Sequence, residues 1–308
     1  MDWRTLLKLC RQAVTAWIGD YAPSMGAAIA YYTVFSIAPL LLIVIAIGGA
    51  VFGREAVQGQ IVHELTALVG ESGATAIQGL LESASNPAHG ILATVISIAV
   101  LAVGATTVFS ELQSALDRIW RVPVPPKQNG VLKLLRTRLL SFGLILGLGF
   151  LLLVSLVVSA ALAALGKWSS GLIPGWESVL QMANTVVGFG LTTVLFAMIY
   201  KIMPRASIAW ADVWIGAGVT AALFEVGKVL IGLYIGKSSI TSGLAAAGSL
   251  LVLLVWVYYS AQIFLLGAEF TWVFAHHHGS HKGELAEGEN LSKTAAPSPR
   301  APQAARSH

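Results

Sequence analysis

The sequence predicts an all-α integral membrane protein, a bundle of six transmembrane helices. Its 308 residues are 56% hydrophobic and only 11% charged, whereas a soluble domain carries about 25% charged residues. The mean hydropathy is +0.75. The single cysteine, Cys10, excludes a disulfide framework and a zinc site built from several thiolates. This composition excludes an ordinary soluble enzyme, and the low charge excludes intrinsic disorder for the body of the chain.

Long apolar segments define the predicted spans. A helix needs about 20 apolar residues to cross a hydrocarbon core of ~30 Å. Each segment reaches that length, and none alternates apolar and polar residues as a β-barrel strand would. Together they predict a membrane domain over 21–275, with spans at about 27–52, 89–110, 139–164, 178–200, 207–235 and 244–270.

Basic residues predict the orientation of these spans, because the cytoplasmic loops of membrane proteins are rich in Lys and Arg. Of the 19 Lys and Arg residues, fifteen fall in the N-terminal segment, the second and fourth connections and the C-terminal tail. Only three fall in the first, third and fifth connections. We therefore expect both termini to lie in the cytoplasm.

Three regions lie outside the predicted spans. Residues 1–20 place apolar side chains on one face, which predicts a short amphipathic helix at the cytoplasmic membrane interface or packed on the bundle. The first external connection, about 54–87, predicts two further short amphipathic helices. From 276 to 308 the sequence has no apolar periodicity, so we expect a disordered cytoplasmic tail.

The first span contains polar residues just before a proline. Tyr31, Tyr32 and Ser36 precede Pro39. A proline inside a helix removes a backbone hydrogen bond and bends the helix. Such a bend either opens a polar cavity or is a detail of packing, and the sequence leaves both open.

Ionisable residues inside the spans are the other candidate site residues, because a charge at the bilayer centre costs about 2.5–3.5 kcal/mol on insertion scales. Glu225 and Lys228 are three residues apart in the fifth span and are predicted to pair. Glu269 lies near the inner end of the last span, and Glu111 holds the matching position in the second. All of these residues either line an intramembrane polar pathway or anchor helices.

The sequence predicts no catalytic, cofactor or metal site. The run His276–His278 and His281 has no carboxylate or thiolate set around it, which favours adventitious metal affinity. No nucleotide-binding loop of the P-loop type is present, so ATP coupling within this chain is excluded. Positive-inside topology already explains the basic second connection, so no nucleic-acid partner is expected. Membrane lipids are the expected partners, and small-residue pairs such as Gly232 and Gly236 pack helices within one chain or in a homo-oligomer.

Five ordered stretches resemble the YihY/virulence factor BrkB family. They are residues 28–41, residues 104–113 with Ile119 and Trp120, residues 139–143, residues 216–220 with 230–234, and residues 247–249 through 257–263 to 267–271. The resemblance covers about 22–275 and implies a six-span protein of the bacterial inner membrane with cytoplasmic termini. Three positions depart from the family pattern: Ser242–Ala245 lacks a usual Tyr-Gly pair, Asp117 replaces an asparagine, and Trp272 replaces an arginine.

The resemblance implies a role in the bacterial envelope, since relatives have been linked to serum resistance and to lipid or lipopolysaccharide traffic. We therefore expect a transporter or a translocator of a lipid or envelope component, with an unknown substrate. The alternative is a non-transporting membrane scaffold or envelope-assembly partner. Some relatives are labelled ribonuclease BN, but the cytoplasmic connections offer Glu111 and Asp117 without a histidine. We therefore expect no enzymatic activity.

Overall fold

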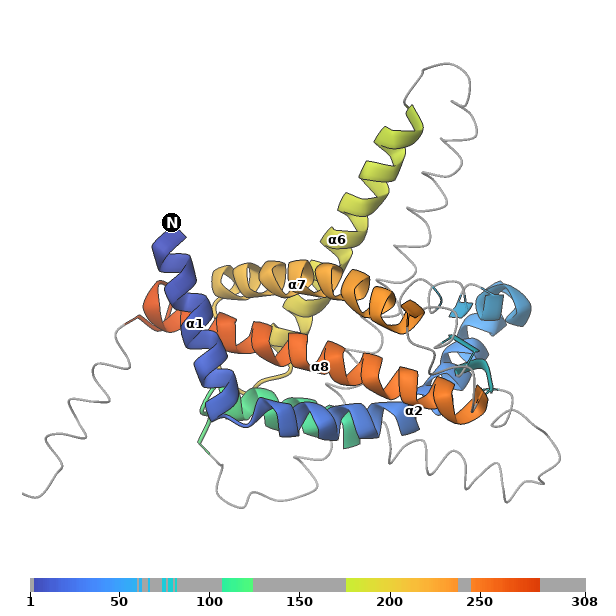
Figure 1. Cartoon of the computed structure of the whole chain (residues 1–308), viewed down its shortest axis with the longest axis horizontal. Helices are drawn as coiled ribbons and strands as arrows, with labels where there is room; N and C mark the ends of the chain where they lie inside the picture. The colour runs from blue at the N-terminus through green and yellow to red at the C-terminus, as the bar shows by residue number, and fades with distance from the viewer. Residues whose placement is uncertain are drawn as a thin grey trace, which may run out of the picture.

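The computed structural model describes residues 3–59, 61–62, 66, 74–75, 77–79, 81, 107–123, 176–237 and 245–282. All regular secondary structure in these residues is helical. The labelled helices in Figure 1 are α1 (Trp3–Gly19), α2 (Ala22–Phe52), α6 (Trp176–Ile202), α7 (Trp210–Lys237) and α8 (Ala245–His277). Residues 107–119 form a further helical stretch.

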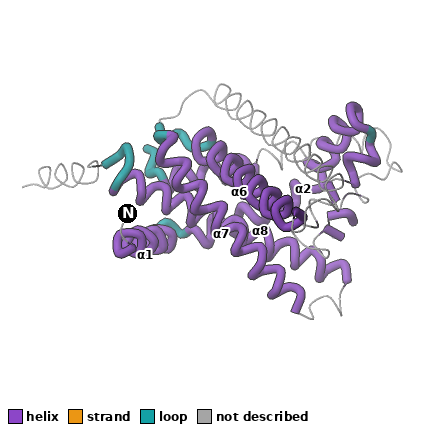
Figure 2. The backbone as a smooth tube through the Cα atoms, turned by 90° about the horizontal axis from the view of Figure 1, so that it is seen from above, coloured by secondary structure: helices purple, strands orange, loops and turns teal. Residues whose placement is uncertain are grey.

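Helix α8 is the centre of the described bundle. It packs against α7, α2 and α1, whereas α6 packs on α7. Figures 1 and 2 show α2, α7 and α8 side by side, with the N-terminal end of α6 projecting beyond them. The larger cluster of buried apolar side chains includes Leu116 and Ile119 from 107–119, Ala217 of α7 and Leu265 of α8. Three segments far apart in the sequence therefore share one core.

Glycines allow α7 and α8 to approach closely. A Cβ atom added at Gly216 of α7 would lie 2.7 Å from the Cβ of Thr271 on α8, and one added at Gly267 of α8 would lie 2.8 Å from the Cβ of Thr220 on α7. In contrast, Gly218 on α7 has nothing within 4 Å of such an atom. Helices in lipid gain van der Waals contact when small residues let their backbones approach, so the first two glycines are packing residues.

Three described helices are long and apolar enough to cross a membrane: Ser178–Ile202, Trp210–Ile231 and Leu250–His277. They overlap the last three predicted spans, and α2 (Ala22–Phe52) contains the first. The second and third predicted spans lie outside the described residues, apart from 107–110. The structure thus supports a helical membrane protein, and the number of six spans stays a prediction.

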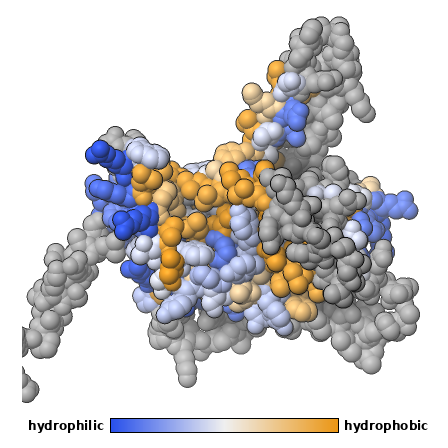
Figure 3. All heavy atoms as spheres, in the orientation of Figure 1, coloured by the Kyte–Doolittle hydropathy of each residue, from blue (hydrophilic) through white to orange (hydrophobic). Residues whose placement is uncertain are grey.

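The surface of these helices is apolar where no other described helix covers it. Val186 of α6 is 64% exposed, and Val229 of α7 is 63% exposed. Figure 3 shows apolar residues over much of the visible bundle and hydrophilic residues gathered near α1. Exposed apolar surface of this extent is typical of helices that face lipid.

The beginning of the predicted disordered tail is ordered, so the predicted boundary at 276 was wrong. Helix α8 continues to His277, and residues 278–282 form a turn. Backbone N–H groups of His278 and Gly279 donate to the carbonyl of Phe274, and that of His281 donates to Ala275. These hydrogen bonds cap the end of α8 and hold the turn against the bundle. Residues 283–308 lie outside the described part of the chain.

Candidate functional site

The most unusual polar group of the described bundle is the carboxyl of Glu269. Its side chain is completely buried, at 0% exposure, and neither carboxyl oxygen has a hydrogen-bond partner among the described residues. Asp20, between α1 and α2, is the negative side chain that acts most strongly on it. Oδ2 of Asp20 is also buried without a partner. Two acidic groups therefore meet inside the protein without the donors that normally satisfy them.

Two tight turns place the groups around Glu269. Tyr21 adopts the left-handed conformation, with φ of 57°, at the turn between α1 and α2, next to Asp20. Arg121 adopts the same conformation, with φ of 51°, after the helical stretch 107–119. Because α1 and α8 pack together, the first turn brings Asp20 to the last predicted span.

Arg121 supplies the positive charge at this site. Its charge acts on Glu269 in the opposite sense to that of Asp20, and its guanidinium lies 4.2 Å above the ring of Trp272. Such a contact holds a cation by electrostatic attraction to the aromatic face. The guanidinium therefore reaches α8 from another segment of the chain.

Glu225 and Lys228 form the ion pair that their spacing predicts. Lys228 Nζ lies 2.8 Å from Glu225 Oε2. The Lys228 side chain is 27% exposed and the Glu225 side chain is 38% exposed, so the pair lies at the surface of α7 rather than in its core. The ammonium also lies 5.9 Å from the centroid of the Phe224 ring.

The other predicted residues lie on separate parts of the bundle. Tyr31 is 56% exposed on α2 and contacts the rings of Tyr32 and Phe35. Ser36 is buried, and its hydroxyl has no hydrogen-bond partner. Pro39 lies within α2, and Glu111 is half-buried on the stretch 107–119. Within the described residues, none of them is hydrogen-bonded to Glu269.

Asp212 is a second buried carboxylate, and one of its oxygens accepts two hydrogen bonds. It is 3% exposed at the start of α7, and its Oδ2 accepts hydrogen bonds from the backbone N–H of Ser280 at 3.0 Å and from the Ser280 hydroxyl at 2.6 Å. His281 Nε2 lies 3.1 Å from the carbonyl of Ser207. The turn after α8 is therefore fastened to the start of α7.

The two histidines nearest this turn pack against aromatic rings. The rings of His276 and His281 stack with centroids 5.4 Å apart, and Trp120 lies beside both. This packing replaces the flexible surroundings expected for these histidines. The described residues contain no group of three or more His, Cys, Asp or Glu side chains arranged to hold a metal ion.

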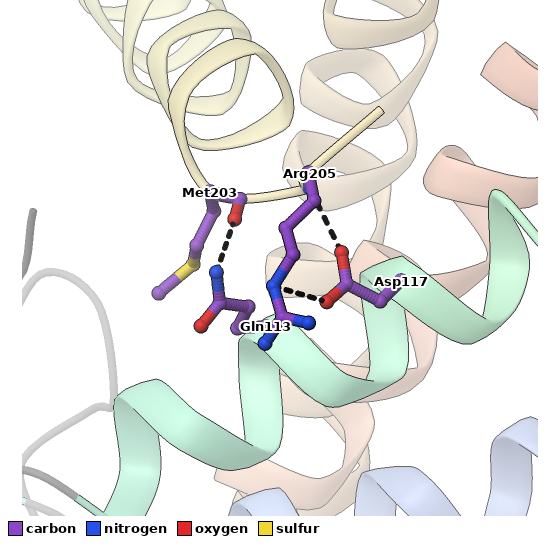
Figure 4. A network of polar contacts seen from close by, with 4 residues as sticks. All are labelled: Gln113, Asp117, Met203 and Arg205. Carbon is purple, nitrogen blue, oxygen red and sulfur yellow. Dashed lines mark hydrogen bonds and ion pairs between the residues drawn. The ribbon is translucent and has the colours of Figure 1, made fainter. Parts of the chain in front are cut away.

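A polar network fastens 107–119 to the connection after α6, as Figure 4 shows. Gln113 Nε2 donates to the carbonyl of Met203 at 3.1 Å. Asp117 Oδ1 accepts from the backbone N–H of Arg205 at 2.8 Å, and its Oδ2 lies 3.4 Å from Arg205 Nε. The charge of Asp117 thus adds an ion pair to the backbone contact.

Sequence reasoning did not single out Asp20 or Arg121. Asp20 stands one residue before the first long uncharged segment, and Arg121 belongs to a basic connection. Neither position has a periodic pattern that points to Glu269. The sequence pointed to this site only through Glu269, an acidic residue in the last predicted span.

Comparison with known proteins agrees with the architecture. The virulence factor BrkB family matches residues 13–291. UPF0761 membrane proteins are similar to this chain: one from Pseudomonas paraeruginosa is 28% identical over 271 residues, covering 85% of this chain and 61% of the relative. Another, from Pseudoalteromonas translucida, is 28% identical over 265 residues, covering 84% and 83%.

A relative from Pseudomonas aeruginosa is 29% identical over 261 residues, covering 82% of this chain and 59% of the relative. The chain thus spans about 60% of the length of the Pseudomonas relatives. No solved structure matches the chain. Because the family match extends over most of the sequence and the described helices are apolar, the chain belongs to the virulence factor BrkB family of membrane proteins.

Proposed function

We propose that this protein spans the bacterial inner membrane several times, with both termini in the cytoplasm, and translocates a lipid or another amphipathic component of the envelope. The observation that carries the proposal is the position of the ion pair Glu225–Lys228. The pair lies near the middle of α7, at the edge of an exposed apolar face. A charged pair in that position is costly for an inert membrane anchor and useful for a protein that handles polar headgroups.

The neighbours of the pair support this interpretation. Val226 is 59% exposed and Val229 is 63% exposed, so the charged atoms lie next to surface that suits lipid chains. A lipid headgroup that crosses the membrane must leave water, and its charges then need partners. The carboxylate and the ammonium offer a partner to each sign of a zwitterionic headgroup. An amphipathic substrate with a charged headgroup therefore fits this surface.

Reconstitution of the full chain into lipid vesicles tests the proposal. A lipid with a labelled headgroup should become accessible from the opposite leaflet faster than in empty vesicles. The double variant Glu225→Gln with Lys228→Met should slow this movement by about tenfold, which corresponds to losing ~1.4 kcal/mol of headgroup stabilisation. Glu55→Gln is the matched control, because Glu55 is exposed outside the long apolar helices. Movement no faster than in empty vesicles would overturn the proposal.

The orientation is tested separately with fusions at the C-terminus. A reporter that is active only in the cytoplasm, fused after His308, should give signal in bacterial cells. A reporter that is active only in the periplasm should give none at the same position. The reverse result would show that the basic connections lie outside.

A non-transporting scaffold is the alternative function. Small-residue pairs such as Gly232 and Gly236 and the amphipathic first external connection motivate it. Gly216 and Gly267 pack α7 and α8 within one chain, so these two glycines add no support for a partner protein. Crosslinking that recovers one fixed partner, together with vesicles that show no lipid movement, would favour the scaffold.

We also propose that the chain is not a ribonuclease. Asp117 is bound to Arg205, and Glu111 lies half-buried one turn and a half away on the same helical stretch. Phosphodiester hydrolysis needs a metal held by clustered carboxylates or a pair of acid–base side chains. A metal-dependent nuclease activity of the purified protein that Glu111→Gln abolishes would contradict this.

A further inference from the structure

We propose that Asp20 and Glu269 form a binding site for a single proton, buried where the turn between α1 and α2 meets α8. The two carboxyl groups share this proton. The inference goes beyond translocation, since the site binds its proton whether or not a lipid moves. It stands on the burial of Glu269, on three carboxyl oxygens without hydrogen-bond partners, and on the charges assembled there.

The charged groups at the site leave one negative charge uncompensated. Among the described residues, the charged groups that act on Glu269 are Asp20, from the turn before α2, and Arg121, from the turn after 107–119. Two ionised carboxylates and one guanidinium leave a net charge of −1 around a side chain that is 0% exposed. An uncompensated buried charge is strongly unfavourable in the protein interior. One bound proton makes the cluster neutral.

The hydrogen-bonding pattern also fits a proton. Both oxygens of Glu269 and Oδ2 of Asp20 are acceptors without a donor. When one carboxyl is protonated, its O–H group becomes a donor to the other carboxylate, which satisfies groups on both residues at once. Two carboxyl groups that approach closely commonly share a proton for this reason, because both cannot stay ionised.

Other ligands fit less well. Mg²⁺ takes six oxygen ligands and Ca²⁺ takes about six to eight, whereas the site presents three unpartnered carboxyl oxygens. Arg121 does not fill the gap, since its guanidinium lies over the ring of Trp272 and neither oxygen of Glu269 receives a hydrogen bond from it. The proton is the cation that needs the fewest ligands.

Infrared spectroscopy of the full chain in lipid nanodiscs tests the proposal directly. The wild type should show the C=O stretching band of a protonated carboxyl group, and the band should disappear when the pH is raised. Glu269→Gln should remove the band. Asp20→Asn should remove it too, because Glu269 and Arg121 alone are already neutral together. Glu55→Gln is the control and should keep the band.

The Asp20→Asn result separates a shared proton from one that belongs to Glu269 alone. A band that persists in Asp20→Asn would overturn the shared site. A wild-type protein without any such band from mildly acidic to alkaline pH would overturn the proposal as a whole. Neither result depends on a transport assay, so failure of the proton site is distinguishable from failure of translocation.

Thermal unfolding in the same nanodiscs supplies a second measurement. The folded protein holds the proton, whereas the exposed carboxyls of the unfolded chain release theirs at neutral pH. Stability should therefore fall as the pH rises, by up to tenfold in the unfolding equilibrium constant per pH unit for one proton. Glu269→Gln should flatten this dependence relative to the wild type and to Glu55→Gln.

Replacing K⁺ by Na⁺ at constant ionic strength tests whether the site binds a sodium ion instead of a proton. A proton site predicts that replacing K⁺ by Na⁺ leaves the unfolding temperature of the wild type unchanged. Stabilisation by Na⁺ that is lost in Glu269→Gln would overturn the proton and assign the site to a sodium ion.

Discussion

Asp212 and Glu269 are both buried carboxylates near one end of neighbouring helices, yet their surroundings differ completely. Asp212 is 3% exposed and receives two hydrogen bonds from Ser280, whereas Glu269 is 0% exposed and receives none. A satisfied buried carboxylate fastens two segments together. An unsatisfied one needs a partner that the described part of the chain does not supply. Burial alone therefore does not distinguish an anchor from a binding site.

Glu225, on the same helix as Asp212, is a carboxylate that is stabilised in a third way. Its partner is a charge three residues away, and the pair stays partly exposed. The three carboxylates are thus stabilised by a distant serine, by a neighbouring lysine and, in our proposal, by a proton. Each solution predicts a different response when the partner is removed.

Removing the partner of Asp212 should have the largest effect. A chain that ends before Gly279 lacks Ser280 and leaves a buried carboxylate without either donor. We expect it to lose about 3–5 kcal/mol of stability, measured by thermal unfolding in detergent. A chain that ends after Lys282 keeps both hydrogen bonds and is the control. Equal stability of the two truncated chains would show that the contact with Ser280 stabilises nothing.

The second-largest loss of stability is expected at the contact between α7 and α8 that lies between Asp212 and Glu269. Gly216 lies one turn after Asp212 and faces Thr271, which follows Glu269 by two residues. Gly216→Ala forces α7 and α8 apart and should cost about 1–3 kcal/mol. Gly218→Ala, where the added Cβ meets open space, should be neutral or stabilising by up to ~1 kcal/mol because alanine favours helices. The same unfolding measurement on both variants compares them, and equal effects would contradict close packing at Gly216.

Breaking the exposed pair should have a smaller effect. Lys228→Met leaves Glu225 without its partner, whereas the double change with Glu225→Gln removes both charges. We expect the single variant to be less stable than the double variant by about 1–2 kcal/mol, since the pair is only partly buried. A double-mutant cycle on thermal stability measures this coupling. Additive effects would mean that the two side chains do not interact in the membrane.

The smallest effect is expected at Glu269 itself. Glu269→Gln exchanges a neutral acid for a neutral amide of the same shape, so its stability at neutral pH should change by less than about 1 kcal/mol. Glu225→Gln leaves Lys228 without its partner and should therefore reduce stability more than Glu269→Gln does. Unfolding of both variants at neutral pH tests the contrast. A larger loss at Glu269 than at Glu225 would indicate that Glu269 is ionised and structurally paired.

Local patterns in the sequence were sufficient for much of the fold. Long apolar segments predicted α2, α6, α7 and α8, because an apolar run in lipid must satisfy its backbone within a helix. The amphipathic pattern of the first 20 residues predicted α1. The spacing of Glu225 and Lys228 predicted their contact, since residues three apart are neighbours on any helix.

Contacts between distant segments could not be predicted in this way. Asp20 and Arg121 reach Glu269 only because two left-handed turns direct them toward α8, and no periodic pattern records those turns. The turn after α8 was expected to be disordered because Gly279 and Ser280 resemble a flexible tail. Its order comes from Asp212, a residue of another helix.

The sequence by itself determined that this is a helical membrane protein, where most of the described helices run, and which charge on α7 pairs with which. Those properties depend on transfer of apolar residues into lipid and on hydrogen bonds within one helix, both of which are local. Tertiary structure alone decided which carboxylate became an anchor and which was left without a partner. That outcome depends on how helix faces meet, and close packing at Gly216 and Gly267 sets those faces.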